Sequence, residues 1–257
     1  MKIVTYNVNG IRASSNKGLV KWLNETDADI YALQEIRADE QTTMQVLYGN
    51  FIDNINKYET ILNISQRAGY SGTAIITKQK PLKVRFGFDE SNEDAEGRLI
   101  TAYYKDFILV NCYVPNGGTR LDFKMEYYEK LTKYLTKLKE ENNVIFCSDS
   151  NIAHTENDVS HPSSAITKTG FLPIEQEAFT KLLANGFIDS YRSLHPSNKA
   201  YSWRSYRERM FKNDNNVKYR FDYIITNSEY NERLISSEIL DLEYSDHLPV
   251  INVYKDK

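Results

Sequence analysis

Two ionisable side chains stand next to each other near the end of the chain, in the stretch YSDHLPV at 244–250. Neighbouring residues of an extended chain point to opposite sides, so Asp246 and His247 each need a partner of their own. A catalytic imidazole is usually oriented by a carboxylate, and the upstream candidate is Asp222, which opens the apolar run Ile224-Ile225. We therefore expect an Asp222–His247 pair that leaves Asp246 free for a metal ion. The alternative is a Ser-Asp-His turn that only caps a strand.

Three other apolar runs end in side chains whose oxygen atoms can bind a metal ion. Asn7 follows the first run, Glu35 the second, and Asp149 with Asn151 the third. A carboxylate at the end of a buried strand is costly unless it is paired or binds a cation, so Glu35 is a metal-ligand candidate, with an ordinary salt bridge as the alternative. Asp149 and Asn151 share one face of their strand and could hold a nucleophilic water, one as base and one as orienter, or form an Asx turn instead.

Aromatic and cationic side chains are interleaved in the segment 201–212, which contains Trp203, Arg204 and Arg207. Aromatic rings can stack on bases, and cations can pair with phosphates. The mixture therefore suits contact with nucleic acid, and a solvated loop is the alternative.

The composition of the chain excludes several classes of protein. The chain has 257 residues, of which 41% are hydrophobic and 26% charged, and its net charge is -3. Such a chain can bury a large core, and its charge argues against a protein that coats polyanions indiscriminately. No run approaches the roughly 20 apolar residues of a membrane span, and polar Asn7 comes too early for a signal peptide. Cys112 and Cys147 lie in apolar runs without metal-binding spacing, which predicts reduced core residues and a cytoplasmic protein.

The elements that must position these side chains alternate between strands and helices, without a Pro/Ser-rich linker or a low-complexity tract. This pattern predicts one layered α/β domain over residues 1–257. Tyr113 falls at the end of one apolar strand, and the long helix after it carries leucines at helical spacing, which predicts a core-facing stripe. Strands are expected at 2–10, 30–36, 73–77, 98–104, 108–114 and 144–151, and helices at 17–24, 121–141 and 175–183.

The motifs also follow one another in the order of a known family. The segments that match it are KIVTYNVNGIRA (2–13), DIYALQEI (29–36), GYSGTAI (69–75), EGRLI (96–100), LVNCYVPN (109–116), SDSNIAHTENDV (148–159), GFLPIEQEAF (170–179), GFIDSYRSLHP (186–196), YSW (201–203), YRFDY (219–223) and SDHLPV (245–250). With these segments, which cover nearly the whole chain, it resembles exonuclease III and the related abasic-site endonucleases of the endonuclease/exonuclease/phosphatase superfamily.

The resemblance implies an α/β fold of four layers, a sandwich of two packed mixed β-sheets flanked by helices, with the site at one end. Its metal-site members match Asn7, Glu35 and Asp246. Its catalytic members match the water-activating pair Asp149 and Asn151, the phosphoryl-stabilising pair Asp222 and His247, and Tyr113 near the target phosphate. Its pocket for an extruded baseless sugar matches Trp203, Tyr219 and Phe221.

The activity implied by the resemblance is cleavage of DNA 5′ to a baseless sugar, which leaves a 3′-hydroxyl, with 3′-5′ exonuclease and 3′-phosphatase activities as further expectations. Oxygen-rich ligands and the absence of a Cys/His cluster favour Mg²⁺ over zinc, with Mn²⁺ as a substitute. The expected partner is double-stranded DNA containing abasic sites or 3′ blocks, and the expected state is a cytoplasmic monomer without membrane contact.

Several positions depart from the family pattern, mostly at positions where members of the family bind DNA. The loop after Asn116 is shorter than usual and leaves Arg120 as its cation. The other substituted positions are Asn9, Ser148, Ala165, Lys168, Arg204 and Lys218. Two alternatives therefore stay open. One is a phosphodiesterase of the same fold that acts on RNA or a small phosphodiester, and the other is a nucleic-acid-binding protein with attenuated catalysis.

Overall fold

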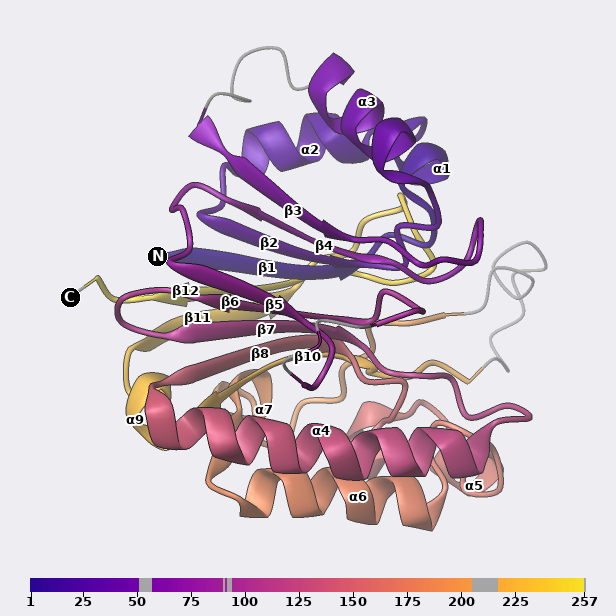
Figure 1. Cartoon of the computed structure of the whole chain (residues 1–257). Coiled ribbons are helices and arrows are strands. Elements are labelled where there is room, and N and C mark those ends of the chain that lie inside the picture. The colour runs from indigo at the N-terminus through magenta and orange to yellow at the C-terminus, as the bar shows by residue number, and fades with distance from the viewer. Residues whose placement is uncertain (51–56, 90, 92–93, 205–216, 257) are drawn as a thin grey trace.

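Two sheets of six strands each pack face to face (Figure 1). The computed structural model describes residues 1–50, 57–89, 91, 94–204 and 217–256. The first sheet has the order β11 (Leu234–Ile239), β12 (Val250–Tyr254), β1 (Lys2–Asn7), β2 (Ile30–Gln34), β4 (Thr73–Thr77) and β3 (Glu59–Asn63). The second has the order β5 (Lys83–Phe86), β6 (Leu99–Tyr103), β7 (Ile108–Tyr113), β8 (Val144–Asp149), β10 (Asp222–Asn227) and β9 (Phe187–Asp189).

Helices cover the outer face of each sheet, so that the layers run helix, sheet, sheet, helix (Figure 1). The first sheet carries α1 (Ile11–Ser15), α2 (Leu19–Thr26) and α3 (Glu40–Asn50), and the second carries α4 (Leu121–Glu141) and α6 (Pro173–Ala184). Short helices lie in the connections, namely α5 (Pro162–Ala165), α7 (Ser190–Leu194) and α9 (Ser228–Asn231). This arrangement confirms the expected four-layer α/β sandwich. Within the described ranges, none of the helices is both long and apolar enough to cross a membrane.

Some element boundaries differ from the sequence-based expectation. The helix expected at 17–24 begins at Leu19, because Gly18 adopts φ 110° and separates it from the short helix α1. The first strand ends at Asn7 and not at Gly10, since Asn9 and Gly10 both take positive φ angles. By contrast, the strand Thr73–Thr77 and the helix Leu121–Glu141 occupy the ranges that were predicted.

Strand periodicity directs particular side chains into the space between the sheets. Successive residues of a strand face opposite ways, so Ile145, Cys147 and Asp149 of β8 share one face. Ile145 and Cys147 belong to the core between the sheets, whereas Phe146 packs in the core under α4. Asp149 therefore lies on the inner face at the end of its strand.

Register brings the ends of several strands to the same place. In the first sheet Asn7 of β1 lies opposite Gln34 of the parallel strand β2. In the second sheet Asp149 lies opposite both Tyr113 of β7 and Asp222 of β10. The polar ends of these strands thus meet at one end of the sandwich, away from the two chain termini (Figure 1).

Candidate active site

A cleft of about 690 Å³ opens where the polar strand ends meet. It collects most of the side chains that the sequence singled out, since its walls include Asn7, Glu35, Tyr113, Arg120, Asp149, Asn151, Trp203, Tyr219, Phe221, Asp246 and His247. Asp222 lies behind His247, buried at 1% exposure. Arg207 falls outside the described residues.

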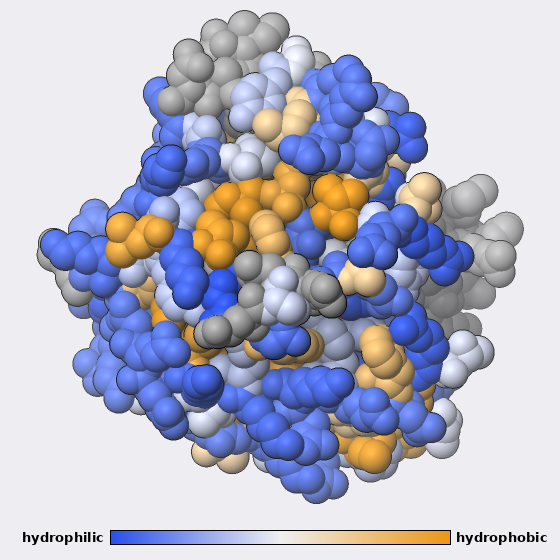
Figure 2. Space-filling model, viewed as in Figure 1, coloured by the Kyte–Doolittle hydropathy of each residue, from blue (hydrophilic) through white to orange (hydrophobic). Residues whose placement is uncertain are grey.

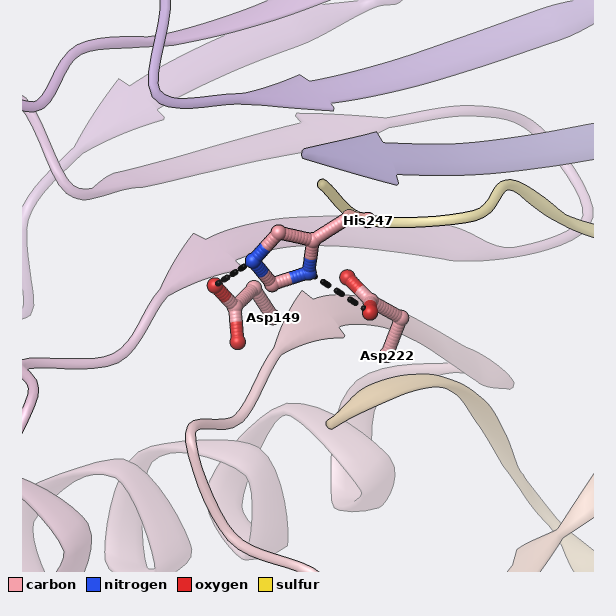
Figure 3. Close-up of side chains that lie close together, drawn as sticks. All are labelled: Asp149, Asp222 and His247. Atoms are coloured by element: carbon pink, nitrogen blue, oxygen red, sulfur yellow. Dashed lines mark hydrogen bonds and ion pairs between the residues drawn. The ribbon is translucent and has the colours of Figure 1, made fainter. Parts of the chain in front are cut away.

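The His247 ring lies between two carboxylates, one at each ring nitrogen (Figure 3). Nδ1 is 2.8 Å from Asp222 Oδ2, and Nε2 is 3.7 Å from Asp149 Oδ2. The expected Asp222–His247 hydrogen bond is therefore present. Ser202 supports it, because its hydroxyl donates to the same Asp222 oxygen at 2.6 Å and accepts the backbone N–H groups of Phe221 and Asp222.

The two carboxylates decide the protonation of the imidazole. Burial alone would lower the pKa of His247, but Asp222 and Asp149 outweigh burial and raise that pKa to about 10. The two carboxylates thus favour the protonated ring, whose second nitrogen faces Asp149. Burial raises the pKa of Asp149 to about 7, against the lowering effect of His247.

Asp149 is held on both oxygens by amide groups. The Asn7 side chain donates from Nδ2 to Oδ2 at 2.7 Å, across the gap between the sheets. The backbone N–H of Asn151 donates to Oδ1 at 2.9 Å, in a residue with φ 50°. This second bond is the Asx turn that the sequence left open as an alternative, and the same turn orients the carboxylate toward the cleft.

Glu35 enters the cleft because the chain kinks after β2, where Glu35 itself adopts φ 53°. Its Oε1 accepts a hydrogen bond from the Tyr113 hydroxyl and forms an ion pair with Arg37 at 3.0 Å. Burial and the nearby Glu35 charge hold the pKa of Tyr113 well above its usual value, so the phenol keeps the proton that it donates. The salt bridge of the alternative interpretation thus exists, but among the described residues both contacts fall on Oε1 and Oε2 makes no hydrogen bond.

Asp246 has partners different from those of its neighbour His247, as expected for adjacent residues in an extended segment. Its Oδ1 accepts a hydrogen bond from the Asn9 amide at 2.7 Å. Its Oδ2 accepts one from the Trp203 indole N–H at 3.2 Å.

Three aromatic rings form one wall of the cleft. Tyr219 and Phe221 stack with centroids 4.8 Å apart, and Trp203 lies 5.7 Å from Phe221 and 5.8 Å from Tyr219. Gly170 lets its loop approach this wall, because a Cβ there would come within 2.7 Å of the Phe221 ring. The result is a small apolar recess beside His247.

The predicted DNA-binding cations differ in their surroundings. Arg120 lies on the rim, where it pairs with Glu96 at 3.1 Å and donates to the Tyr70 hydroxyl at 3.3 Å. Arg204 does not line the cleft, and its guanidinium pairs with Asp241 at 2.9 Å. Within the described part of the chain, Arg37, Arg98 and Lys168 also line the cleft.

Sequence reasoning missed a buried ion pair that ties the site loops together. Lys124 of α4 donates to Glu175 of α6 at 2.5 Å and to the Asn151 carbonyl at 2.7 Å, and both side chains are fully buried. Glu175 also accepts the backbone N–H groups of Gly170 and Leu172. In the sequence, the one feature that could have indicated this pair is a lysine within an otherwise apolar helical stripe. Nothing in the sequence indicated that Ser202 would hydrogen-bond to Asp222.

Comparisons with known proteins identify the family of the chain. Residues 4–247 match the model of the Endonuclease/Exonuclease/phosphatase family. The chain is 37% identical to an exodeoxyribonuclease of Bacillus subtilis, over 97% of this chain and 98% of that protein. It is 36% identical to the DNA repair nuclease APEX1 of Danio rerio, over 97% of this chain and 81% of that protein.

Solved structures give the same picture. An AP endonuclease from Archaeoglobus fulgidus superposes with a TM-score of 0.85 at 28% identity, covering 100% of both chains. A 3′ phosphatase, NExo, from Neisseria, bound to a product DNA hairpin, superposes with a TM-score of 0.87 at 25% identity, covering 99% of both chains. The chain therefore belongs to the Endonuclease/Exonuclease/phosphatase family and, within it, to the hydrolases of the exonuclease III and AP endonuclease branch.

Proposed function

We propose that this protein is a Mg²⁺-dependent DNA repair nuclease that cleaves the backbone 5′ to abasic sites and also removes 3′ nucleotides and 3′ phosphates. The observation that carries the proposal is the cleft in which a buried carboxylate, an imidazolium and an aromatic recess face one another. The relatives named as an exodeoxyribonuclease, an AP endonuclease and a 3′ phosphatase support the same range of reactions.

Asp149 is the proposed general base. In its deprotonated form it takes a proton from a water molecule, whose oxygen then bonds to phosphorus while the bond from phosphorus to the 3′-oxygen breaks. The departing 3′-oxygen takes a proton from solvent and becomes the 3′-hydroxyl. Asn7 and the Asn151 N–H hold the carboxylate in position for this transfer. His247 carries positive charge, oriented by Asp222, and is suited to stabilise the charge that develops on the phosphoryl oxygens.

Tyr113 and the carboxylates of Glu35 and Asp246 line the cleft in which we place the cation. Oxygen donors fit a hard ion such as Mg²⁺, and Mn²⁺ accepts the same donors. Glu35 Oε2, the Asp246 carboxylate and the Asn7 amide oxygen are the proposed ligands. Such an ion supplies charge neutralisation at the phosphate and at the departing oxygen.

A second cluster could hold an ion, since ligand atoms of Asp149, Asp222 and His247 all lie within 4.8 Å of one another. In its protonated form the imidazole carries a proton on each nitrogen, with Nδ1–H hydrogen-bonded to Asp222, and it has no lone pair for a metal ion. We therefore assign the ion to the Glu35 side of the cleft.

The aromatic recess supports an abasic substrate. We place a baseless sugar that leaves the DNA stack against the wall formed by Trp203, Tyr219 and Phe221, where a nucleotide with its base needs more room.

One experiment tests the proposal directly. End-labelled duplexes with a single abasic analogue, an intact sequence or an RNA strand are incubated with and without Mg²⁺. We expect one cut, 5′ to the analogue, only in the presence of Mg²⁺, and Asp149→Asn and His247→Ala should each slow it by about a hundredfold or more. Cleavage confined to RNA would support the RNA alternative, and binding without any cleavage would support attenuated catalysis.

A further inference from the structure

Hydrogen bonds hold both oxygens of the Asp246 carboxylate, and one of the donors also belongs to the aromatic recess. The Asn9 amide donates to Oδ1 at 2.7 Å, and the Ser245 hydroxyl donates to the same oxygen at 3.3 Å. The indole N–H of Trp203 is the donor to Oδ2, at 3.2 Å. The backbone reinforces the second contact, because the N–H of Arg204 donates to the Asp246 carbonyl at 3.1 Å. An isolated β-bridge also pairs Trp203 with His247.

We propose that Trp203 is a positioning residue for the cation site, because its indole N–H fixes the Asp246 carboxylate while its ring forms the wall of the recess. This inference rests on the proposed function, in which Asp246 helps to bind the cation.

The physical reason lies in the freedom of an aspartate side chain on a loop. A carboxylate that rotates freely must be ordered when a cation binds, whereas one held by hydrogen bonds on both oxygens is already oriented. Hydrogen-bond partners of ligating carboxylates typically contribute about 10-fold to 100-fold in metal affinity. Tyr219 and Phe221, the other two rings of the recess, have no polar contact with Asp246 among the described residues. Of the three rings, Trp203 is therefore the one that links the two parts of the site.

Any coupling through Trp203 between cation binding and sugar binding must act equally in both directions. If a sugar in the recess shifts the indole, it changes the affinity for the cation, and a bound cation changes the affinity for the sugar by the same factor. Trp203 would thus couple recognition of the lesion to assembly of the catalytic site.

Binding of Mn²⁺ to the full chain, followed by the electron paramagnetic resonance signal of free Mn²⁺, tests this role without any turnover. Trp203→Phe keeps an aromatic wall but loses the N–H, and it should weaken Mn²⁺ binding about 10-fold. Phe221→Leu alters the same wall and should leave Mn²⁺ binding unchanged. In an Asp246→Ala background, Trp203→Phe should have no further effect, because no side-chain oxygen remains to accept the indole N–H.

Nuclear magnetic resonance of the unaltered protein gives a second readout that does not depend on the folding of a variant. The chain has 2 tryptophans, so its indole N–H region should contain two signals. Mg²⁺ should shift the Trp203 signal and not that of Trp22, which is buried against Tyr6.

The outcomes separate the inference from the proposed function. If the unaltered protein binds no Mn²⁺, the proposed cation site itself is wrong. If it binds Mn²⁺ and Trp203→Phe binds equally well, or Phe221→Leu is weakened to the same extent, the positioning role is wrong. A Trp203 signal that does not respond to Mg²⁺ would also overturn it.

Discussion

Asp222 and His247 show how single residues can be paired from the amino-acid sequence alone. A histidine at a strand entrance that contains a proline needs a carboxylate, and Asp222, which opens an apolar run upstream, was the best candidate. The bond between Asn7 and Asp149 could not be predicted in this way, because it joins residues that are 142 positions apart and lie in different sheets. Nor could the indole contact to Asp246, since a tryptophan in an aromatic segment gives no sign of where its N–H points.

The pH dependence of the reaction follows from these residues. We expect kcat/KM to rise with pH through about 7, as Asp149 loses its proton, and to fall through about 10, as His247 loses its charge. Asp222→Asn removes the carboxylate that raises the pKa of His247, so the falling limb should move to lower pH. The measurement is kcat/KM on an abasic duplex between pH 5 and pH 11, roughly the range that spans both groups. A falling limb that stays in place would show that His247 does not act as the cation.

The substitution Glu35→Gln tests whether Glu35 is a ligand of the cation. The amide keeps an oxygen ligand but loses the negative charge that attracts a divalent ion. The Mg²⁺ concentration needed for half-maximal cleavage should therefore rise, and excess Mg²⁺ should partly restore the rate. Glu96→Gln is a suitable control, because Glu96 is also paired with an arginine at the cleft but is not a proposed ligand. An unchanged Mg²⁺ titration for Glu35→Gln would make Glu35 a purely structural partner of Arg37.

At the scale of elements, burial on both faces decided which parts of the fold were predictable. The central strands were found because they are fully buried, and α4 because its leucines repeat at helical spacing. Three strands outside the predicted ranges, β3, β5 and β11, lie at sheet edges and are only partly buried. Edge strands carry polar residues on exposed positions, so their sequences lack the continuous apolar run of a central strand.

The Lys124–Glu175 ion pair joins α4 and α6 to the loops that shape the cleft. Lys124→Met leaves a buried carboxylate without its cation and the Asn151 carbonyl without a donor, which should lower the free energy of unfolding by about 3–5 kcal/mol. The double change Lys124→Met with Glu175→Gln should cost less than the sum of the single changes.

Urea unfolding measures these differences, and Lys133→Met provides the matched control. Lys133 lies on the same helix in an exposed ion pair with Glu129, so its loss should change the stability by less than about 1 kcal/mol. Equal effects of Lys124→Met and Lys133→Met would show that the buried pair does not support the loops.

The whole molecule combines a negative total charge with cations at the mouth of the cleft. On the face shown in Figure 2, hydrophilic residues cover much of both helical layers, and apolar residues gather mainly between them. Because Arg37, Arg98, Arg120 and Lys168 line the cleft, the net charge of -3 says little about the proposed DNA-binding surface. What the sequence did reveal at this scale was the order of the family motifs, which implied the four layers and the position of the site together.

Binding of DNA depends on how the cations are distributed over the molecule, and the sequence offered Arg120 and the segment 201–212 for it. Arg204 pairs with Asp241 and does not line the cleft. Arg120 and Lys168 do line it, and the Arg120 side chain is 44% exposed although it pairs with Glu96. Each cation that neutralises a phosphate releases counterions, so its loss lowers the slope of log affinity against log salt concentration by about 1. The double variant Arg120→Ala with Lys168→Ala, in a protein made catalytically inactive by Asp149→Asn, should therefore weaken duplex binding and flatten that slope by up to about 2.

The control is Lys133→Ala with Lys181→Ala, which removes the same charge from the groove between α4 and α6 and should leave the slope unchanged. If both pairs change the slope equally, DNA responds to the total charge of the molecule and not to the rim of the cleft.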